Sequence, residues 1–173
     1  MGSFVKSVLV FGVSVLLAVV GVEGADAAKV EQVMAGEIKE AHVSWWGFDK
    51  EDSTAFLRAA IKSRVPKLIV DNMGAPWITD HLQLVSNQEI IFEKGVEVVA
   101  KRGAFKSRAA SMINLVGVEN VTLRGPGATI RMHRADYDAP PYVKAEWRHL
   151  VCMRGCTNIK ILGLTLAESG GDG

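Results

Sequence analysis

Two stretches of the chain carry the same alternation of apolar and polar positions. Residues 117–125 read GVENVTLRG and residues 155–163 read GCTNIKILG, so glycine, asparagine and the apolar positions coincide when Gly117 is aligned with Gly155. A fainter copy, IIFEKGVEV, occupies residues 90–98, and its apolar positions coincide when Ile90 is aligned with Val121. In every copy the alternation resumes after a glycine, which predicts two short strands joined by a turn.

A short unit that recurs from Ile90 to Val121, and again from Gly117 to Gly155, predicts a solenoid, in which each repeat packs on the next. We therefore expect an all-β protein with the architecture of a right-handed parallel β-helix, in which Val121 and Ile159 share one column. Asn120 and Asn158 are expected at the corners, because asparagine tolerates a left-handed backbone and can bond to the asparagine one coil away. The alternative is a β-sandwich whose glycine and asparagine turns coincide by chance.

Helical periodicity precedes the repeats. Asp52 or Ser53 can serve as an N-cap, and Pro66 ends the pattern, so a helix is predicted over residues 52–63. A helix ahead of the first coil would cover strand edges that otherwise invite pairing with other chains. We expect an N-terminal cap over residues 28–65 and the first coils of the β-helix over residues 66–173. The predicted buried face of the helix consists of Phe56, Ala59, Ala60 and Ser63.

The N-terminal segment has the character of an export signal. Lys6 gives a positive start, an apolar run follows from Ser7 to Val22, and residues 25–27 read ADA, a small-x-small cleavage pattern. The alternative is a membrane anchor, but the apolar run is short for a full span. We predict a signal peptide over residues 1–27 and a secreted or periplasmic mature chain, which contacts the membrane only during export.

The composition of the chain limits the kinds of molecule that it is expected to bind. The chain has 173 residues, is 49% apolar and carries a formal charge of +1, so it can bury a core and shows no basic run for nucleic acid. Cys152 and Cys156 are the only cysteines. In an oxidising compartment they could form a disulfide, but Cys152 lies in an apolar run, and we favour two buried thiols.

A polar and aromatic insertion separates the two clearest repeats. It combines aromatic rings, which stack on sugar faces, with arginines, which bind carboxylates through two N–H groups. This predicts the rim of a groove for an acidic polysaccharide. The alternative is a loop packed on itself, with Trp147 turned inward and Glu146 paired to an arginine. A basic loop at 101–108 is read as a solvated turn or as an attraction for an anionic polymer. The candidate substrate-binding residues are Arg131, His133, Tyr137, Trp147 and Arg148.

The sequence stops at Gly-Gly-Asp-Gly, directly after the last repeat. A solenoid needs a closing cap or a polar last coil, and neither is visible in the sequence. We therefore expect an N-terminal portion of a longer protein, truncated after the first few coils and inactive alone.

From about His42 to Gly173 the chain resembles the opening of secreted pectate-lyase-like and polygalacturonase-like β-helix proteins. The resemblance covers nearly the whole mature chain and implies a pectin-lyase-like solenoid, while members of this superfamily differ in reaction. The matching segments are GFDKEDST at 47–54, AAI at 59–61, WI at 77–78, NQEI at 87–90, GPGA at 125–128, EWR at 146–148 and SGGDG at 169–173.

The resemblance also suggests a catalytic residue. Asp172 resembles the aspartate of the Asn-Thr-Asp-Gly turn in the hydrolases, although Gly170 and Gly171 replace the Asn-Thr pair. Hydrolysis needs a second carboxyl group, and a lyase needs a base and a cation, often Ca²⁺, although the sequence shows no Ca²⁺ loop and no metal ligands are assigned. The expectation is therefore a polysaccharide lyase or glycoside hydrolase. The alternative is a non-catalytic glycan-binding or adhesin-type β-helix.

Overall fold

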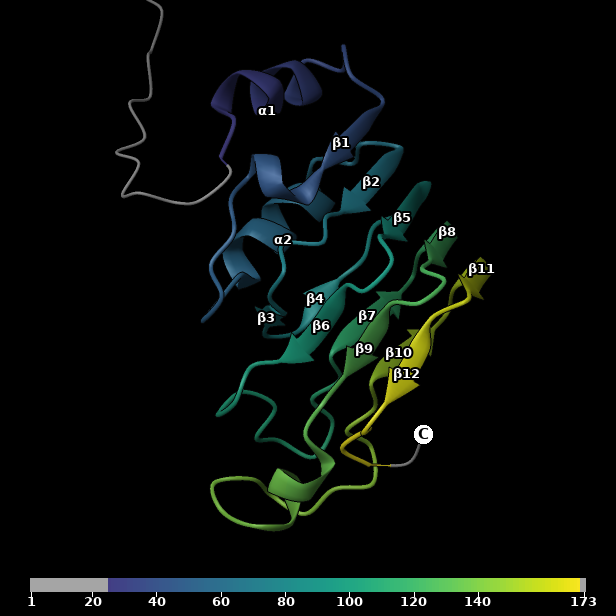
Figure 1. Cartoon of the computed structure of the whole chain (residues 1–173). Coiled ribbons are helices and arrows are strands. Elements are labelled where there is room, and N and C mark those ends of the chain that lie inside the picture. The colour runs from purple at the N-terminus through teal and green to yellow at the C-terminus, as the bar shows by residue number, and fades with distance from the viewer. Residues whose placement is uncertain (1–24, 172–173) are drawn as a thin grey trace, which may run out of the picture.

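The protein is a β solenoid built from three parallel sheets (Figure 1). The computed structural model describes residues 25–171, so most of the predicted signal peptide (1–24) and Asp172 lie outside the described residues. One sheet has the order β1-β2-β5-β8-β11, a second β10-β7-β4 and a third β12-β9-β6-β3. The strands are β1 Glu40–His42, β2 Lys67–Val70, β3 Trp77–Thr79, β4 Leu82–Gln83, β5 Gln88–Phe92, β6 Glu97–Ala100, β7 Ile113–Val116, β8 Glu119–Arg124, β9 Thr129–Arg131, β10 Val151–Arg154, β11 Thr157–Leu162 and β12 Thr165–Ala167.

Every strand pairing in the described chain is parallel, and successive coils lie directly over one another. Ile159 pairs with Val121, which confirms the predicted column and excludes the sandwich. Inward side chains stack into continuous apolar columns, which bury the faces that no single coil could bury alone. One such column contains Ala41, Leu68, Ile90, Leu123 and Ile161.

The alignment predicted for the faint third repeat is wrong. Ile90 pairs with Leu123 in place of Val121. A shift of two positions keeps every side chain on the same face, so the apolar pattern cannot distinguish the two registers. The position that pairs with Val121 is Gln88, a buried polar residue whose Nε2 donates to the Val65 carbonyl at 2.9 Å.

The N-terminal elements lie at the β1 end of the stack (Figure 1). They are α1 Ala27–Met34, η1 Val43–Trp45 and α2 Thr54–Lys62. The helix α2 contacts β3, β4 and η1, and its buried face is Thr54, Leu57, Ala60 and Ile61. The predicted face is rotated from the observed one: Ala59 is exposed, because turning Leu57 and Ile61 inward buries more apolar area.

The first sheet begins before residue 66. The strand β1 lies within residues 28–65, yet it already pairs with β2 in the first sheet. Within residues 25–171 no helix is long and apolar enough to cross a bilayer. Cys152 and Cys156 are both free thiols, the first buried and the second half-buried.

Candidate functional site

The predicted insertion protrudes from the stack between β9 and β10 (Figure 1). It contains the short helix η2, Arg134–Asp138. Tyr137 is only 3% exposed and packs edge-on against Tyr142, with ring centroids 4.8 Å apart. Burial raises the pKa of the Tyr137 phenol to about 12. The inner side of the insertion is therefore a packed aromatic core, as expected of a loop packed on itself.

Arg148 occupies the centre of this core. It is completely buried, and its guanidinium carbon lies 4.6 Å from the centroid of the Tyr137 ring and 5.9 Å from that of Tyr142. Within residues 25–171 no carboxylate forms an ion pair with it, so carbonyl oxygens and ring faces surround the charge. Tyr137 and Arg148, both predicted to bind substrate, thus lie beneath the surface.

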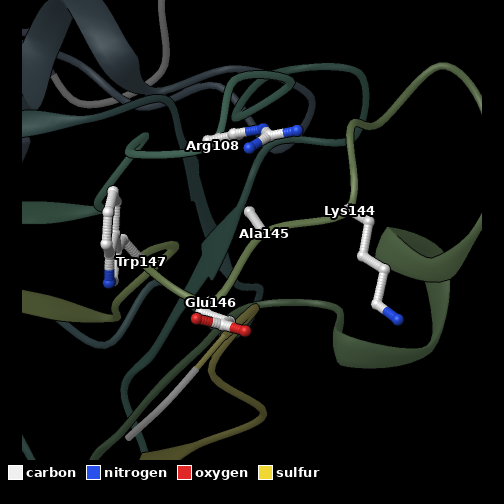
Figure 2. Close-up of a pocket in the computed structure, with 5 residues that line it drawn as sticks. All are labelled: Arg108, Lys144, Ala145, Glu146 and Trp147. Atoms are coloured by element: carbon white, nitrogen blue, oxygen red, sulfur yellow. The ribbon is translucent and has the colours of Figure 1, made fainter.

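Trp147 points outward, contrary to the inward orientation of the self-packed alternative. It is 61% exposed and lines a hollow of about 310 Å³ on the outer side of the insertion (Figure 2). Arg108, Lys144 and Glu146 line the same hollow, and in Figure 2 the Lys144 side chain extends away from Arg108 and Trp147. Arg108 comes from the loop after β6, whereas the other residues belong to the insertion. The site therefore offers a flat aromatic face, two cations and one carboxylate.

A second hollow, of about 360 Å³, lies beside the outer face of β6 and β9. Arg131 and His133 line it, together with Lys50, Lys101 and Arg102. Most of its positive charge is already neutralised: Lys101 pairs with Asp52 at 2.6 Å, Arg131 with Glu97 at 3.7 Å, and Arg102 with Asp136. This hollow is consequently a poorer site for an anion than the one beside Trp147.

His133 is held in one orientation within this second hollow. Its Nε2 lies 2.9 Å from the Ala100 carbonyl, so this nitrogen donates its proton and Nδ1 is the acceptor. Burial, with a further contribution from the Arg102 charge, lowers the pKa of His133 from its ordinary value of 6.5. Both effects favour the neutral form of the imidazole.

The structure separates the residues that sequence patterns group together. Arg131 and His133 line one hollow, Trp147 lines the other, and Tyr137 and Arg148 form the packed core of the insertion. The sequence does not assign Arg108 or Lys144 to the site; Arg108 belongs to the basic loop at 101–108, for which a solvated turn is the first interpretation and attraction of an anionic polymer the alternative. Glu146 is predicted only as part of the EWR segment of the family resemblance and as the partner of an arginine in the self-packed alternative.

Metal ligands do not cluster in the described part of the chain. Residues 25–171 contain no group of three or more His, Cys, Asp or Glu side chains placed to hold an ion. The Trp147 hollow holds one described carboxylate, whereas hydrolysis with inversion or retention needs two. The chemistry that these residues support directly is recognition: ring stacking by Trp147 and attraction of an anion by Arg108 and Lys144.

Comparison with known proteins supports the fold. No protein-family model matches the chain, and no curated protein matches its sequence. A solved structure that matches is the crystal structure of a putative glycosyl hydrolase from Parabacteroides merdae ATCC 43184, at 1.95 Å resolution. The identity is 20%, the TM-score is 0.60, and the match covers 77% of this chain and 68% of the other. At this identity the likeness shows that the two chains share a fold.

Proposed function

We propose that this chain is a carbohydrate-active β solenoid that binds an acidic polysaccharide in the Trp147 hollow. The observation that carries the proposal is an indole, 61% exposed, in a hollow lined by Arg108 and Lys144. A large exposed aromatic ring loses hydrophobic free energy unless a partner covers it, and a sugar ring offers a matching flat apolar face. The two cations would then select chains that carry carboxylates over neutral ones.

The proposed handedness of the solenoid and its proposed superfamily follow from the resemblance seen in the sequence. We infer a right-handed winding, as parallel crossovers within one sheet adopt, and membership of the pectate-lyase-like superfamily. The structural neighbour is named a putative glycosyl hydrolase, which is consistent with a carbohydrate substrate. The predicted signal peptide supports export to the secreted or periplasmic space. The reaction would be hydrolysis or β-elimination, with Asp172 as a catalytic candidate and Ca²⁺ as a cofactor if the protein is a lyase.

A second candidate function is binding without cleavage. It is favoured by the single described carboxylate, Glu146, in the hollow. Both candidates require recognition of the glycan, and they differ in whether products form. Because this portion is expected to be inactive alone, the test uses a form extended by any coils encoded after Gly173, incubated with polygalacturonate with and without Ca²⁺. Unsaturated uronates then indicate a lyase, reducing ends alone indicate a hydrolase, and neither product indicates a binding protein.

The binding step itself can be tested by titration calorimetry with a polyuronate and with a neutral glucan. An aromatic stacking contact is worth about 1 kcal/mol, so Trp147→Ala should raise the dissociation constant for both ligands roughly fivefold. Lys144→Ala should weaken polyuronate binding and leave neutral glucan binding unchanged. The matched control is Lys62→Ala on the exposed side of α2. Equal binding of polyuronate by the wild type and Trp147→Ala would exclude the hollow as the site.

A further inference from the structure

The Arg148 side chain connects three separate segments of the chain. Its Nε donates to the Phe105 carbonyl at 2.8 Å, and its Nη2 donates to the Val143 carbonyl at 2.6 Å and to the Ser107 carbonyl at 3.3 Å. Longer contacts reach Lys106 and Gly170, both at 3.4 Å. These carbonyls belong to the loop after β6, the insertion and the segment that follows β12. The ring of Tyr137 in η2 completes the enclosure.

Two of these carbonyls immediately precede the cations of the Trp147 hollow. Val143 is followed by Lys144, and Ser107 is followed by Arg108. Arg148 itself follows Trp147. One guanidinium therefore fixes the backbone next to each of the three side chains that would contact an acidic glycan.

Further contacts around the guanidinium also join the segments that line the hollow. The Val143 amide donates to the Lys106 carbonyl at 3.0 Å, so the two walls of the hollow are joined beside the guanidinium. Gly170 packs so tightly on Arg148 that an added Cβ would lie 2.5 Å from the arginine Cδ. Burying a charge is costly unless its hydrogen bonds are made, and within residues 25–171 the hydrogen bonds of Arg148 go to backbone carbonyls, so each of these contacts offsets part of that cost.

We propose that Arg148 is the positioning residue of the Trp147 hollow, setting the spacing of Arg108, Lys144 and Trp147. The inference rests on the function proposed above and goes beyond it, because it assigns the geometry of the site to one buried group that the glycan does not touch. An arginine is required, since its planar guanidinium donates in several fixed directions, whereas a lysine ammonium is a compact charge with three donors.

The test uses fluorine NMR of protein labelled with 5-fluorotryptophan. The chain has four tryptophans, and Trp147→Phe assigns the resonance of Trp147. Trp45, Trp46 and Trp77 lie in the N-terminal half and report whether the solenoid is folded. We expect Arg148→Met and Arg148→Lys to shift and broaden the Trp147 resonance and to leave the other three unchanged. The control is Arg124→Met, which removes an exposed arginine that bonds to Glu89 at 3.1 Å.

Binding measurements on the same variants complete the test. We expect both Arg148 variants to weaken polyuronate binding at least tenfold, as Arg108, Lys144 and Trp147 lose their common arrangement. An unchanged Trp147 resonance in Arg148→Lys would overturn the positioning role, and so would loss of all four resonances in both variants, which would make Arg148 a residue of the global fold. Failure of the wild type to bind polyuronate would overturn the proposed function, while the NMR result would still decide whether Arg148 positions Trp147.

Discussion

The side-chain amide of Asn158 donates a hydrogen bond to Oδ1 of Asn120, which lies 2.9 Å away in the preceding coil. Asn120 in turn donates to Oδ1 of Asn87 at 2.9 Å, so the three residues form a ladder along one corner of the solenoid. All three have left-handed backbones, with φ of 54°, 55° and 61° respectively. Few side chains other than asparagine tolerate this conformation and can also bond to the next coil.

Replacing Asn120 should therefore destabilise the solenoid in two ways. Asn120→Ala removes two side-chain hydrogen bonds and leaves an alanine in a left-handed conformation, for an expected loss of about 2 kcal/mol in the free energy of unfolding. Asn120→Gly keeps the backbone relaxed and should lose about half of that. Denaturant unfolding of both variants, with Lys62→Ala as an exposed control, measures the difference. Equal stability of Asn120→Ala and the wild type would show that the ladder contributes nothing.

The same ladder shows how far the sequence determines the fold. The clearest repeat is recognisable because glycine, asparagine and apolar positions all coincide, and it correctly predicts the pairing of Val121 with Ile159. The apolar pattern of the faint repeat misaligns it by two positions, because buried Gln88 interrupts that pattern. Aligning Asn87 with Asn120 gives the observed register, since backbone strain at the corner fixes register where hydrophobicity does not.

The site is less predictable than the fold. Sequence patterns identify the insertion and the kinds of side chain that it contains, but they do not show which of these side chains are buried and which are exposed. Trp147 and Arg148 are neighbours, yet one is 61% exposed and the other is completely buried. The hydrogen-bond partners of Arg148 are backbone carbonyls from distant segments. Every residue has such a carbonyl, so the sequence does not indicate which of them will bind the guanidinium.

Acid should weaken the link between the cap and the sheets through Asp52. Burial opposes its ionisation, but hydrogen bonds from Lys101 and Thr54 outweigh burial and lower the pKa of Asp52 below its ordinary value of 3.8. A carboxyl group whose pKa is lower in the folded state contributes stability above its unfolded pKa and loses it as pH falls through the folded pKa. Unfolding free energies measured from about pH 7 to about pH 3 should therefore fall less steeply in Asp52→Asn than in the wild type. Parallel pH profiles for the two proteins would contradict this prediction.

The titration of His133 should respond to its cationic neighbour. Burial is the larger cause of its lowered pKa, and the Arg102 charge adds to it. Arg102→Met should raise the pKa of the His133 imidazole part of the way towards 6.5, because burial remains. The NMR titration of the imidazole carbon-bound protons measures the shift. Arg124→Met, at the end of β8, is the control. A pKa that is equally low in Arg102→Met would assign the whole effect to burial.

Gly171 should be intolerant of any side chain because of the backbone that faces it. A Cβ at this position would lie 2.1 Å from the Glu146 carbonyl oxygen and 2.9 Å from the Arg148 amide nitrogen. Backbone atoms cannot rotate away as the end of a side chain can, so Gly171→Ala must push the terminal segment off the insertion. We expect a loss of about 1–3 kcal/mol in the free energy of unfolding, together with weaker polyuronate binding.

The matched control for Gly171→Ala is Gly74→Ala. Gly74 has a φ of +72° and nothing within 4 Å of an added Cβ, so the change introduces backbone strain without a clash. It should cost about 1 kcal/mol and leave the Trp147 hollow intact. Comparing the two variants by denaturant unfolding and by calorimetry with polyuronate separates a general loss of stability from displacement of the hollow. If Gly171→Ala binds as tightly as Gly74→Ala, the segment after β12 does not support the site, and the hollow depends on the insertion and the loop after β6 alone.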